Sequence, residues 1–219
     1  MIETQMFDNR QSRGEIYPLL PTGTGKLLEL FAGSRSVGSE AEAMGMEVFS
    51  VDWQKFDKIN LAKDIGELTL NDVPFIPDVV WASPDCTTYT IAAISTHRNG
   101  TEPKSEYAKK CDQVNVHFIG LIKEWLKLNP NMVFFIENPR GMLRKMPFMQ
   151  EFKRHTIWYC QYGDDRAKPT DIWSNSQTWK PRPVCHNGNK NCHHTPAPRG
   201  SKTGTQGRKG SYERSKIPQ

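Results

Sequence analysis

Within its 219 residues, the sequence lacks any apolar run of about 18 residues, the length that a membrane-spanning helix needs. Its first residues, MIETQMFDNRQSRGE, also lack the basic and then apolar pattern of a secretory leader. We therefore expect a protein that has no contact with membranes, is not secreted and works in the cytoplasm.

Cysteine is scarce as well. The chain has five cysteines, and their spacing is irregular: Cys86, Cys111, Cys160, Cys185 and Cys192. An odd number without a regular pattern argues against a disulfide framework and favours catalytic or metal-binding roles.

Acidic residues are almost missing from the end of the chain. Residues 176–219 hold nine Lys or Arg and one acid, Glu213, a net charge of +8, whereas the whole chain carries +5. We expect three regions: an N-terminal extension (1–25), a globular domain (26–175) and a basic Gly/Pro-rich segment (176–219). The basic segment suits a nucleic-acid phosphate backbone, although a solvated tail would have the same composition.

Short β-branched and apolar runs alternate with helical patterns along the globular domain, which predicts an α/β fold with a mostly parallel twisted sheet and helices on both faces. The expected strands are Lys26–Phe31, Glu47–Val51, Val79–Trp81, Val133–Ile136, Thr156–Tyr162 and Thr170–Trp173. The expected helices are Ser39–Met44 and Ser105–Leu128.

Residues able to bind ligands or do chemistry follow four of these strands. They are the glycine turn Phe31-Ala32-Gly33, the pair Asp52-Trp53, the loop Ser83-Pro84-Asp85-Cys86 and the pair Glu137-Asn138. Because parallel strands end at the same edge of a sheet, we expect these groups to meet in one crevice. Cys86 is then a candidate nucleophile, whereas a buried structural thiol is the alternative.

In this order, the groups resemble the motifs of the S-adenosylmethionine-dependent DNA cytosine-5 methyltransferases, especially short phage-type members. Over about residues 27–173 the resemblance adds Asp64-Ile65 as the motif that contacts adenine and Tyr162-Gly163 with Arg166 and Lys168 as the arginine motif. It implies a Rossmann-like class I methyltransferase fold and, for a phage protein, the cytoplasm of a bacterial host.

The resemblance also implies roles for individual residues. Cys86 would attack the ring, Glu137 would act as a partly protonated acid, and Arg166 would hold the base carbonyl. Ser83, Asn138 and Lys168 would contact the substrate. S-adenosylmethionine would be bound by Phe31, Ala32, Gly33, Asp52, Trp53, Asp64, Ile65 and Pro84. The partner would be cytosine-containing DNA, with the target base flipped out or single-stranded.

Three departures from the family pattern stand beside these expectations. Asp85 occupies the position where the family usually has Pro, and its carboxylate would raise the pKa of the neighbouring thiol. The arginine motif is reduced to Arg166-Ala167-Lys168. No large target-recognition region follows, so a protein partner or an oligomer could supply recognition. The alternatives are an inactive nucleic-acid-binding protein and a methyltransferase for RNA or an exocyclic amine.

The basic segment contains a cluster of metal-ligand residues, CHNGNKNCHH, from Cys185 to His194. Two thiols and three imidazoles in ten residues are compatible with zinc. The expected ligands are Cys185 and Cys192 with one or two of the histidines His186, His193 and His194, of which His193 is preferred. The six-residue gap between the cysteines is wider than in standard zinc motifs, so a basic loop without metal is the alternative.

Overall fold

A computed structural model describes residues 25–196 and 216–218, and its centre is a seven-stranded sheet in the order β3-β2-β1-β4-β7-β9-β8. The strands are β1 (Lys26–Leu30), β2 (Glu47–Asp52), β3 (Leu61–Ala62), β4 (Val79–Ala82), β7 (Val133–Pro139), β8 (Arg154–Trp158) and β9 (Pro169–Ser174). The five strands from β3 to β7 are parallel to one another, whereas β9 is antiparallel to both of its neighbours. The predicted α/β fold is therefore confirmed.

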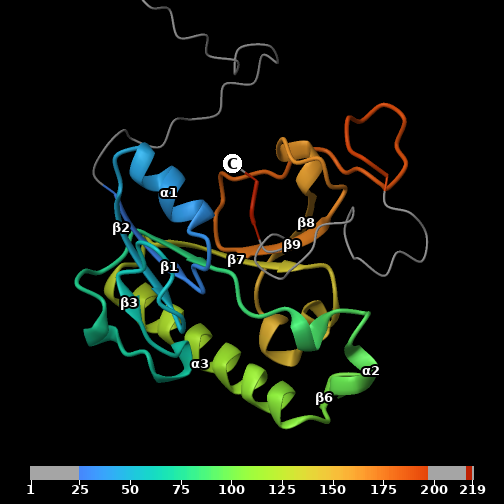
Figure 1. Ribbon diagram of the computed structural model, residues 1–219. Coiled ribbons are helices and arrows are strands. Elements are labelled where there is room, and N and C mark those ends of the chain that lie inside the picture. Colours follow the sequence, from blue (N-terminus) through green and yellow to red (C-terminus); the bar gives the residue numbers. More distant parts are fainter. Residues whose placement is uncertain (1–24, 197–215, 219) are drawn as a thin grey trace, which may run out of the picture.

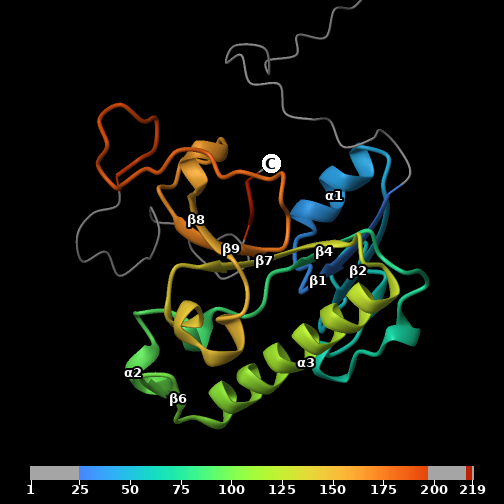
Figure 2. The same ribbon diagram turned by 180° about the vertical axis from the view of Figure 1, so that it is seen from behind.

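Helices lie on both faces of this sheet, α1 (Ser36–Ala43) on one and α3 (Glu106–Leu128) across the other (Figures 1 and 2). Helix α3 begins where Ser105 caps it by accepting a hydrogen bond from the backbone N–H of Ala108. Its apolar stripe, including Phe118, Ile122 and Trp125, is buried in the main core. Among the helices of the described residues, none is long and apolar enough to cross a membrane.

The face that carries α1 is completed by irregular chain. Trp179, which follows β9 in the sequence, packs edge-on against Phe135 of β7, with ring centroids 5.8 Å apart. It also packs edge-on against His155 of β8. Ile157, Tyr159 and Ile172 form a second small core on this side. Residues that follow β9 thus take the place of a further helix on this half of the face (Figure 1).

The remaining short elements connect these layers. They are the helix α2 (Ile94–His97), the two-stranded ribbon β5 (Arg98–Asn99) and β6 (Glu102–Pro103), and the 3-10 turns η2 (Ile65–Glu67), η3 (Leu70–Asp72), η4 (Thr87–Tyr89), η5 (Met142–Lys145), η6 (Pro147–Met149) and η7 (Tyr159–Tyr162).

Several expected boundaries differ by one residue, and those of three elements differ by more, each for a local reason. Strand β7 extends to Pro139 because β9 provides antiparallel partners as far as Pro139. The strand expected over Thr156–Tyr162 ends at Trp158 and continues as η7, which Gly163 terminates with φ 91°. Helix α1 begins at Ser36, earlier than the expected Ser39, directly after Arg35 in a left-handed conformation.

Candidate active site

The loop that carries Cys86 leaves the centre of the sheet, where β4 lies between β1 and β7. It is fastened on both sides of the cysteine. The side-chain amide of Asn138 donates a hydrogen bond of 2.8 Å to the carbonyl oxygen of Pro84. Asp85 accepts hydrogen bonds from the Thr87 backbone and, at 2.6 Å, from the Tyr107 hydroxyl of α3. Cys86 is thus positioned by β7 and α3 together.

Cys86 is half-buried, and partial removal from water raises the pKa of its thiol to about 11. Lys168 acts in the opposite direction and lowers the pKa, whereas the carboxylates of Asp85 and Glu137 raise it further. The direction predicted for Asp85 is confirmed, although burial is the larger cause. At neutral pH the thiol is protonated, and the cation that favours its thiolate is Lys168.

Glu137 and Asn138 lie in the buried end of β7. Glu137 is 5% exposed, and one of its carboxylate oxygens accepts a hydrogen bond of 2.7 Å from the Tyr159 hydroxyl. The side-chain oxygen of Asn138 is buried and has no hydrogen-bond partner among the described residues. Buried polar atoms are normally paired, so this oxygen is available to a ligand that can donate a hydrogen bond.

Arg166 and Lys168 come to the same rim from the loop between η7 and β9. Arg166 is fully buried and forms an ion pair with Asp164. Its guanidinium also donates a hydrogen bond of 2.9 Å to the carbonyl oxygen of Lys216. The Lys168 ammonium lies 4.5 Å from the centre of the Tyr159 ring, and burial lowers the pKa of Lys168. Of the two cations, Lys168 is the one whose charge acts on Cys86.

The glycine turn after β1 is bound to the end of β2. The backbone N–H of Gly33 donates to one carboxylate oxygen of Asp52 at 2.9 Å, and the N–H of Gln54 donates to the other at 3.0 Å. Gly33 has φ 50°, a left-handed conformation that costs glycine least, and open space surrounds the position where a Cβ would lie. Trp53, directly after Asp52, is 68% exposed. This turn leaves room for a ligand beside a buried carboxylate and an exposed indole.

Other predicted cofactor residues already serve the fold with their side chains. Asp64 accepts a hydrogen bond from the N–H of Gly66 and pairs with Lys110 at 2.8 Å, and the Lys110 contact lowers the pKa of Asp64. Ile65 is part of the main core, and Phe31 packs edge-on against Phe118 with centroids 5.4 Å apart. Ala32 and Pro84 are buried. Ser83, which was predicted to contact the substrate, is half-buried and accepts a hydrogen bond from Trp81.

A cavity of about 690 Å³ opens beside the glycine turn. Its walls are the start of α1 with the preceding Ser34 and Arg35, the loop 163–166 that contains Arg166, and the carboxyl-terminal residues 216–218. Figure 1 shows these last residues, in red, beside the loop that joins η7 to β9. A cavity of this size suits a small molecule.

Several residues that shape the site were not predicted. Tyr159 and Asp164 hold Glu137 and Arg166, but their sequence context indicated an ordinary strand and a solvated turn. Gly141 passes so close to the loop after Cys86 that a Cβ there would overlap the carbonyl oxygen of Tyr89. Buried Arg98 pairs with Asp112 of α3 and donates to the Thr88 carbonyl oxygen. Asp164 and Arg166 lie two residues apart in one loop, whereas the other contacts join separate segments and no local spacing signals them.

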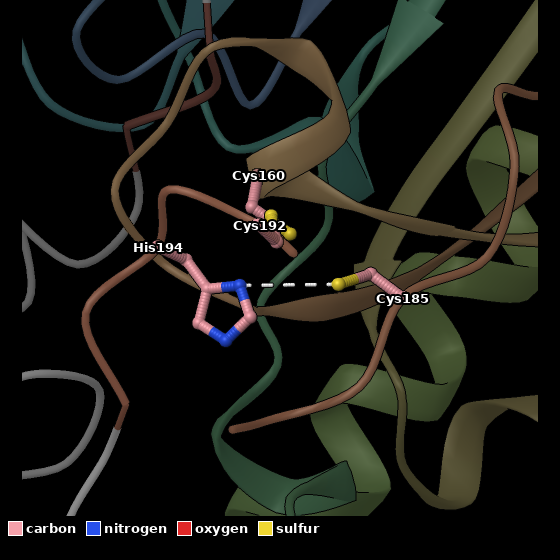
Figure 3. A group of neighbouring side chains, drawn as sticks. All are labelled: Cys160, Cys185, Cys192 and His194. Atoms are coloured by element: carbon pink, nitrogen blue, oxygen red, sulfur yellow. Dashed lines mark hydrogen bonds between the residues drawn. The ribbon is translucent and has the colours of Figure 1, made fainter. Parts of the chain in front are cut away.

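The predicted metal ligands divide into two groups. Cys185 and Cys192 lie together with Cys160 and His194, with their ligand atoms within 4.8 Å of one another (Figure 3). His193 lies outside this cluster, and its Nε2 is 3.0 Å from the carbonyl oxygen of Asp164. The structure therefore brings His194, in place of the expected His193, to the two cysteines and adds Cys160 from η7.

No protein-family model matches the sequence, and a search of curated proteins finds no match. Among solved structures, the fold is similar to the Dnmt2 methyltransferase of S. pombe, with a TM-score of 0.50 and 14% identity over 74% of this chain and 52% of that one. The chain thus spans about half the length of that methyltransferase. A second match, the magnesium protoporphyrin IX methyltransferase of Synechocystis PCC 6803 with bound SAM, has a TM-score of 0.38 and 10% identity, covering 70% of each chain.

The sheet order, the helices on both faces and the likeness to the S. pombe protein define the fold of this chain as the Rossmann-like fold of methyltransferases.

Proposed function

We propose that this chain transfers the methyl group of S-adenosylmethionine to carbon 5 of a cytosine in DNA through a covalent adduct with Cys86. The observation that carries the proposal is the position of Cys86. Its loop, which Asn138 and Asp85 fasten through their hydrogen bonds, lies on the rim of a methyltransferase fold, and the charges of Lys168 and Glu137 act on the thiol.

The thiol fits the chemistry of this reaction because carbon 5 of cytosine is a weak nucleophile until a group adds to carbon 6. In the proposed step, the Cys86 thiol would give its proton to solvent water and its sulfur would form a bond to carbon 6. The ring electrons would move to carbon 5, which would take the methyl group as its bond to the sulfonium sulfur of S-adenosylmethionine breaks and S-adenosylhomocysteine leaves. Loss of the proton from carbon 5 then expels the thiolate and restores the ring.

Glu137 is proposed to protonate or hydrogen-bond N3 of the ring while the thiolate adds. Its contact with Tyr159 holds the carboxyl group in place, and burial together with Glu137 raises the pKa of Tyr159, so the phenol stays protonated and donates. The unpaired side-chain oxygen of Asn138 can accept a hydrogen bond from the exocyclic amine of cytosine.

For Arg166 and Lys168, the two cations of the arginine motif, we propose roles that differ from those implied by the family resemblance. Arg166 is engaged with Asp164 and the Lys216 carbonyl, so we assign it the positioning of the loop 163–166. Lys168 is assigned the stabilisation of the thiolate and of the charge that develops on the base carbonyl.

The residues present fit S-adenosylmethionine, which would supply an electrophilic methyl group. Asp52 is placed to accept hydrogen bonds from ribose hydroxyls through its remaining lone pairs, and the exposed indole of Trp53 can stack on adenine. The open space at Gly33 and the neighbouring cavity leave room for the rest of the molecule.

DNA as the substrate is supported by the basic segment, of which Lys180, Arg182, Lys190 and Lys216 are described, while the other five Lys and Arg lie outside the described residues. The target base has to be flipped out or single-stranded to reach Cys86. Sequence recognition is proposed to come from a protein partner or a second copy of the chain.

A second candidate function, nucleic-acid binding without catalysis, is favoured by one observation: burial and Asp85 both raise the pKa of the Cys86 thiol, which disfavours the nucleophilic thiolate. Methyl transfer to RNA or to an exocyclic amine is a further alternative within the same fold.

The deciding experiment incubates the protein with S-adenosylmethionine carrying a labelled methyl group and with single-stranded DNA, duplex DNA or RNA of random sequence. Nucleosides from each digest are then separated and identified by mass spectrometry. Labelled 5-methylcytosine from DNA is the expected product. Label on a cytosine amine or in RNA alone would support the alternative methyltransferase, and cofactor binding without a labelled product would support the binding protein.

A further inference from the structure

We propose that Cys160, Cys185, Cys192 and His194 bind one structural zinc ion, which fastens the irregular carboxyl-terminal segment to the loop beside the active site. Cys160 belongs to η7, whereas the other three follow β9, and all four side chains converge on one point (Figure 3). The zinc site requires no methyl transfer, so the two proposals can fail separately.

The spacing of the ligand atoms suits tetrahedral zinc. Zinc bonds of about 2.3 Å to sulfur and about 2.0 Å to nitrogen place neighbouring ligand atoms about 3.5 to 3.8 Å apart. The four atoms here lie within 4.8 Å of one another, and Cys185 Sγ is 3.8 Å from His194 Nδ1. Three thiols and one imidazole complete a four-ligand set, which is typical of structural rather than catalytic zinc.

Side-chain amides donate hydrogen bonds to all three sulfurs. The side-chain amide of Gln161 donates to Cys192 Sγ at 3.6 Å and to Cys160 Sγ at 3.8 Å. The side-chain amide of Asn189 donates to Cys185 Sγ at 3.5 Å. Each sulfur therefore accepts an N–H, an outer contact that supports metal-bound thiolates.

In the irregular segment of residues 175–196, the buried residues are members of the proposed zinc cluster. From Asn175 to Pro196 only two residues are buried, Cys185 and His194, and both are proposed ligands. The same residues include no helix or strand. A segment with so little apolar burial has little else to offset its loss of conformational entropy, whereas metal binding supplies folding free energy directly.

The segment holds the loop that carries Arg166 and Lys168. The N–H of Thr195 donates to the carbonyl oxygen of Asp165 at 2.9 Å, His193 contacts that of Asp164, and Arg182 donates to that of Gln161 at 2.6 Å. Cys160 directly follows Tyr159, the partner of Glu137. Zinc would thus stabilise the loop from its outer side.

Two arrangements without metal are the competing explanations. In one, His194 Nδ1–H donates to Cys185 while Nε2 accepts from the N–H of Gly188 at 3.2 Å. This hydrogen bond explains why Cys185 and His194 lie together. It does not explain why Cys160 and Cys192 lie beside them. Zinc on Nδ1 would place a proton on Nε2, so the Gly188 contact would open. In the other arrangement, two of the cysteines form a disulfide.

The test measures zinc in the full-length, tag-free protein by elemental analysis and by native mass spectrometry. One zinc per chain is expected, and the variants Cys160→Ser and His194→Asn should each lose most of it. Cys111→Ser and His193→Asn are the matched controls, because Cys111 lies in α3 and His193 outside the cluster, and both should retain the metal.

Limited proteolysis supplies the second readout and needs no variant. Removing zinc from the wild-type protein with a chelator should expose residues 176–196 to cleavage while the sheet stays protected, and added zinc should restore protection. Metal-free protein with a protected segment would overturn the proposal. So would a disulfide among the three cysteines, or zinc content that both ligand variants retain.

Discussion

The rim of the parallel strands and the segment 175–196 both carry reactive side chains, but different forces hold them. Val80, Ala82 and Ile136, next to the active-site loops, are fully buried in strands with a continuous register. The segment 175–196 has no apolar core of this kind. It depends on the packing of Trp179, on a few polar contacts and on the proposed zinc cluster, to which Cys160 of η7 also belongs. A rim residue can therefore be changed without moving its neighbours, whereas a change in the cluster should loosen a whole segment.

The substitution Cys86→Ser should have the largest effect, and this effect should be confined to the rim and leave the segment 175–196 unchanged. Methyl transfer should be abolished because serine is a far weaker nucleophile at neutral pH, while S-adenosylmethionine affinity stays within a few-fold and zinc content is unchanged. Transfer assays, calorimetry and elemental analysis on the same preparation check all three. Substantial residual transfer would show that the thiol is structural.

Asp52→Ala should have a smaller effect, confined to cofactor binding. We expect S-adenosylmethionine binding to weaken by roughly 1–3 kcal/mol, because a buried hydrogen-bond acceptor is lost. Isothermal calorimetry measures the change, and Trp53→Ala should weaken binding in the same direction through lost stacking. An Asp52→Ala protein that binds with wild-type affinity would remove this carboxylate from the cofactor site.

The smallest expected effects concern the charges around Cys86. A pKa of about 11 means that alkylation of Cys86 by iodoacetamide should keep rising with pH, without the plateau expected for an ordinary thiol. Asp85→Asn should speed alkylation at a given pH because it removes a charge that raises the pKa, and Lys168→Met should slow it. Mass spectrometry of the Cys86 peptide gives the rates, and equal rates in all three proteins would contradict this account.

The sequence predicted the rim of the parallel strands more fully than it predicted the segment 175–196. Apolar runs and turns predicted β1, β2, β4 and β7. Parallel strands necessarily end at one edge of a sheet, so the placement of Asp52, Cys86 and Glu137 along one edge followed from sequence. The contact of Tyr159 with Glu137 and the antiparallel insertion of β9 beside β7 depend on tertiary packing and left no local pattern.

The cluster shows the limit of spacing rules. Cys185 and Cys192 were recognised because they are close in sequence, but Cys160 comes from before β9 and is brought in by the fold. The sequence could not show which of the neighbouring histidines, His193 or His194, faces the cysteines. Their difference lies in the backbone, which directs His194 to the sulfurs and His193 to the Asp164 carbonyl.

The most direct test of the central claim is a covalent trap with random-sequence DNA containing 5-fluorocytosine, supplied single-stranded and as duplex together with S-adenosylmethionine. Fluorine at carbon 5 cannot leave as a proton does, so the adduct cannot release its thiolate. Peptide mass spectrometry should find a methylated 5-fluorocytosine nucleotide linked to Cys86. Methylation of ordinary DNA by the same preparation, without any link to Cys86 in the trap, would contradict the proposed mechanism.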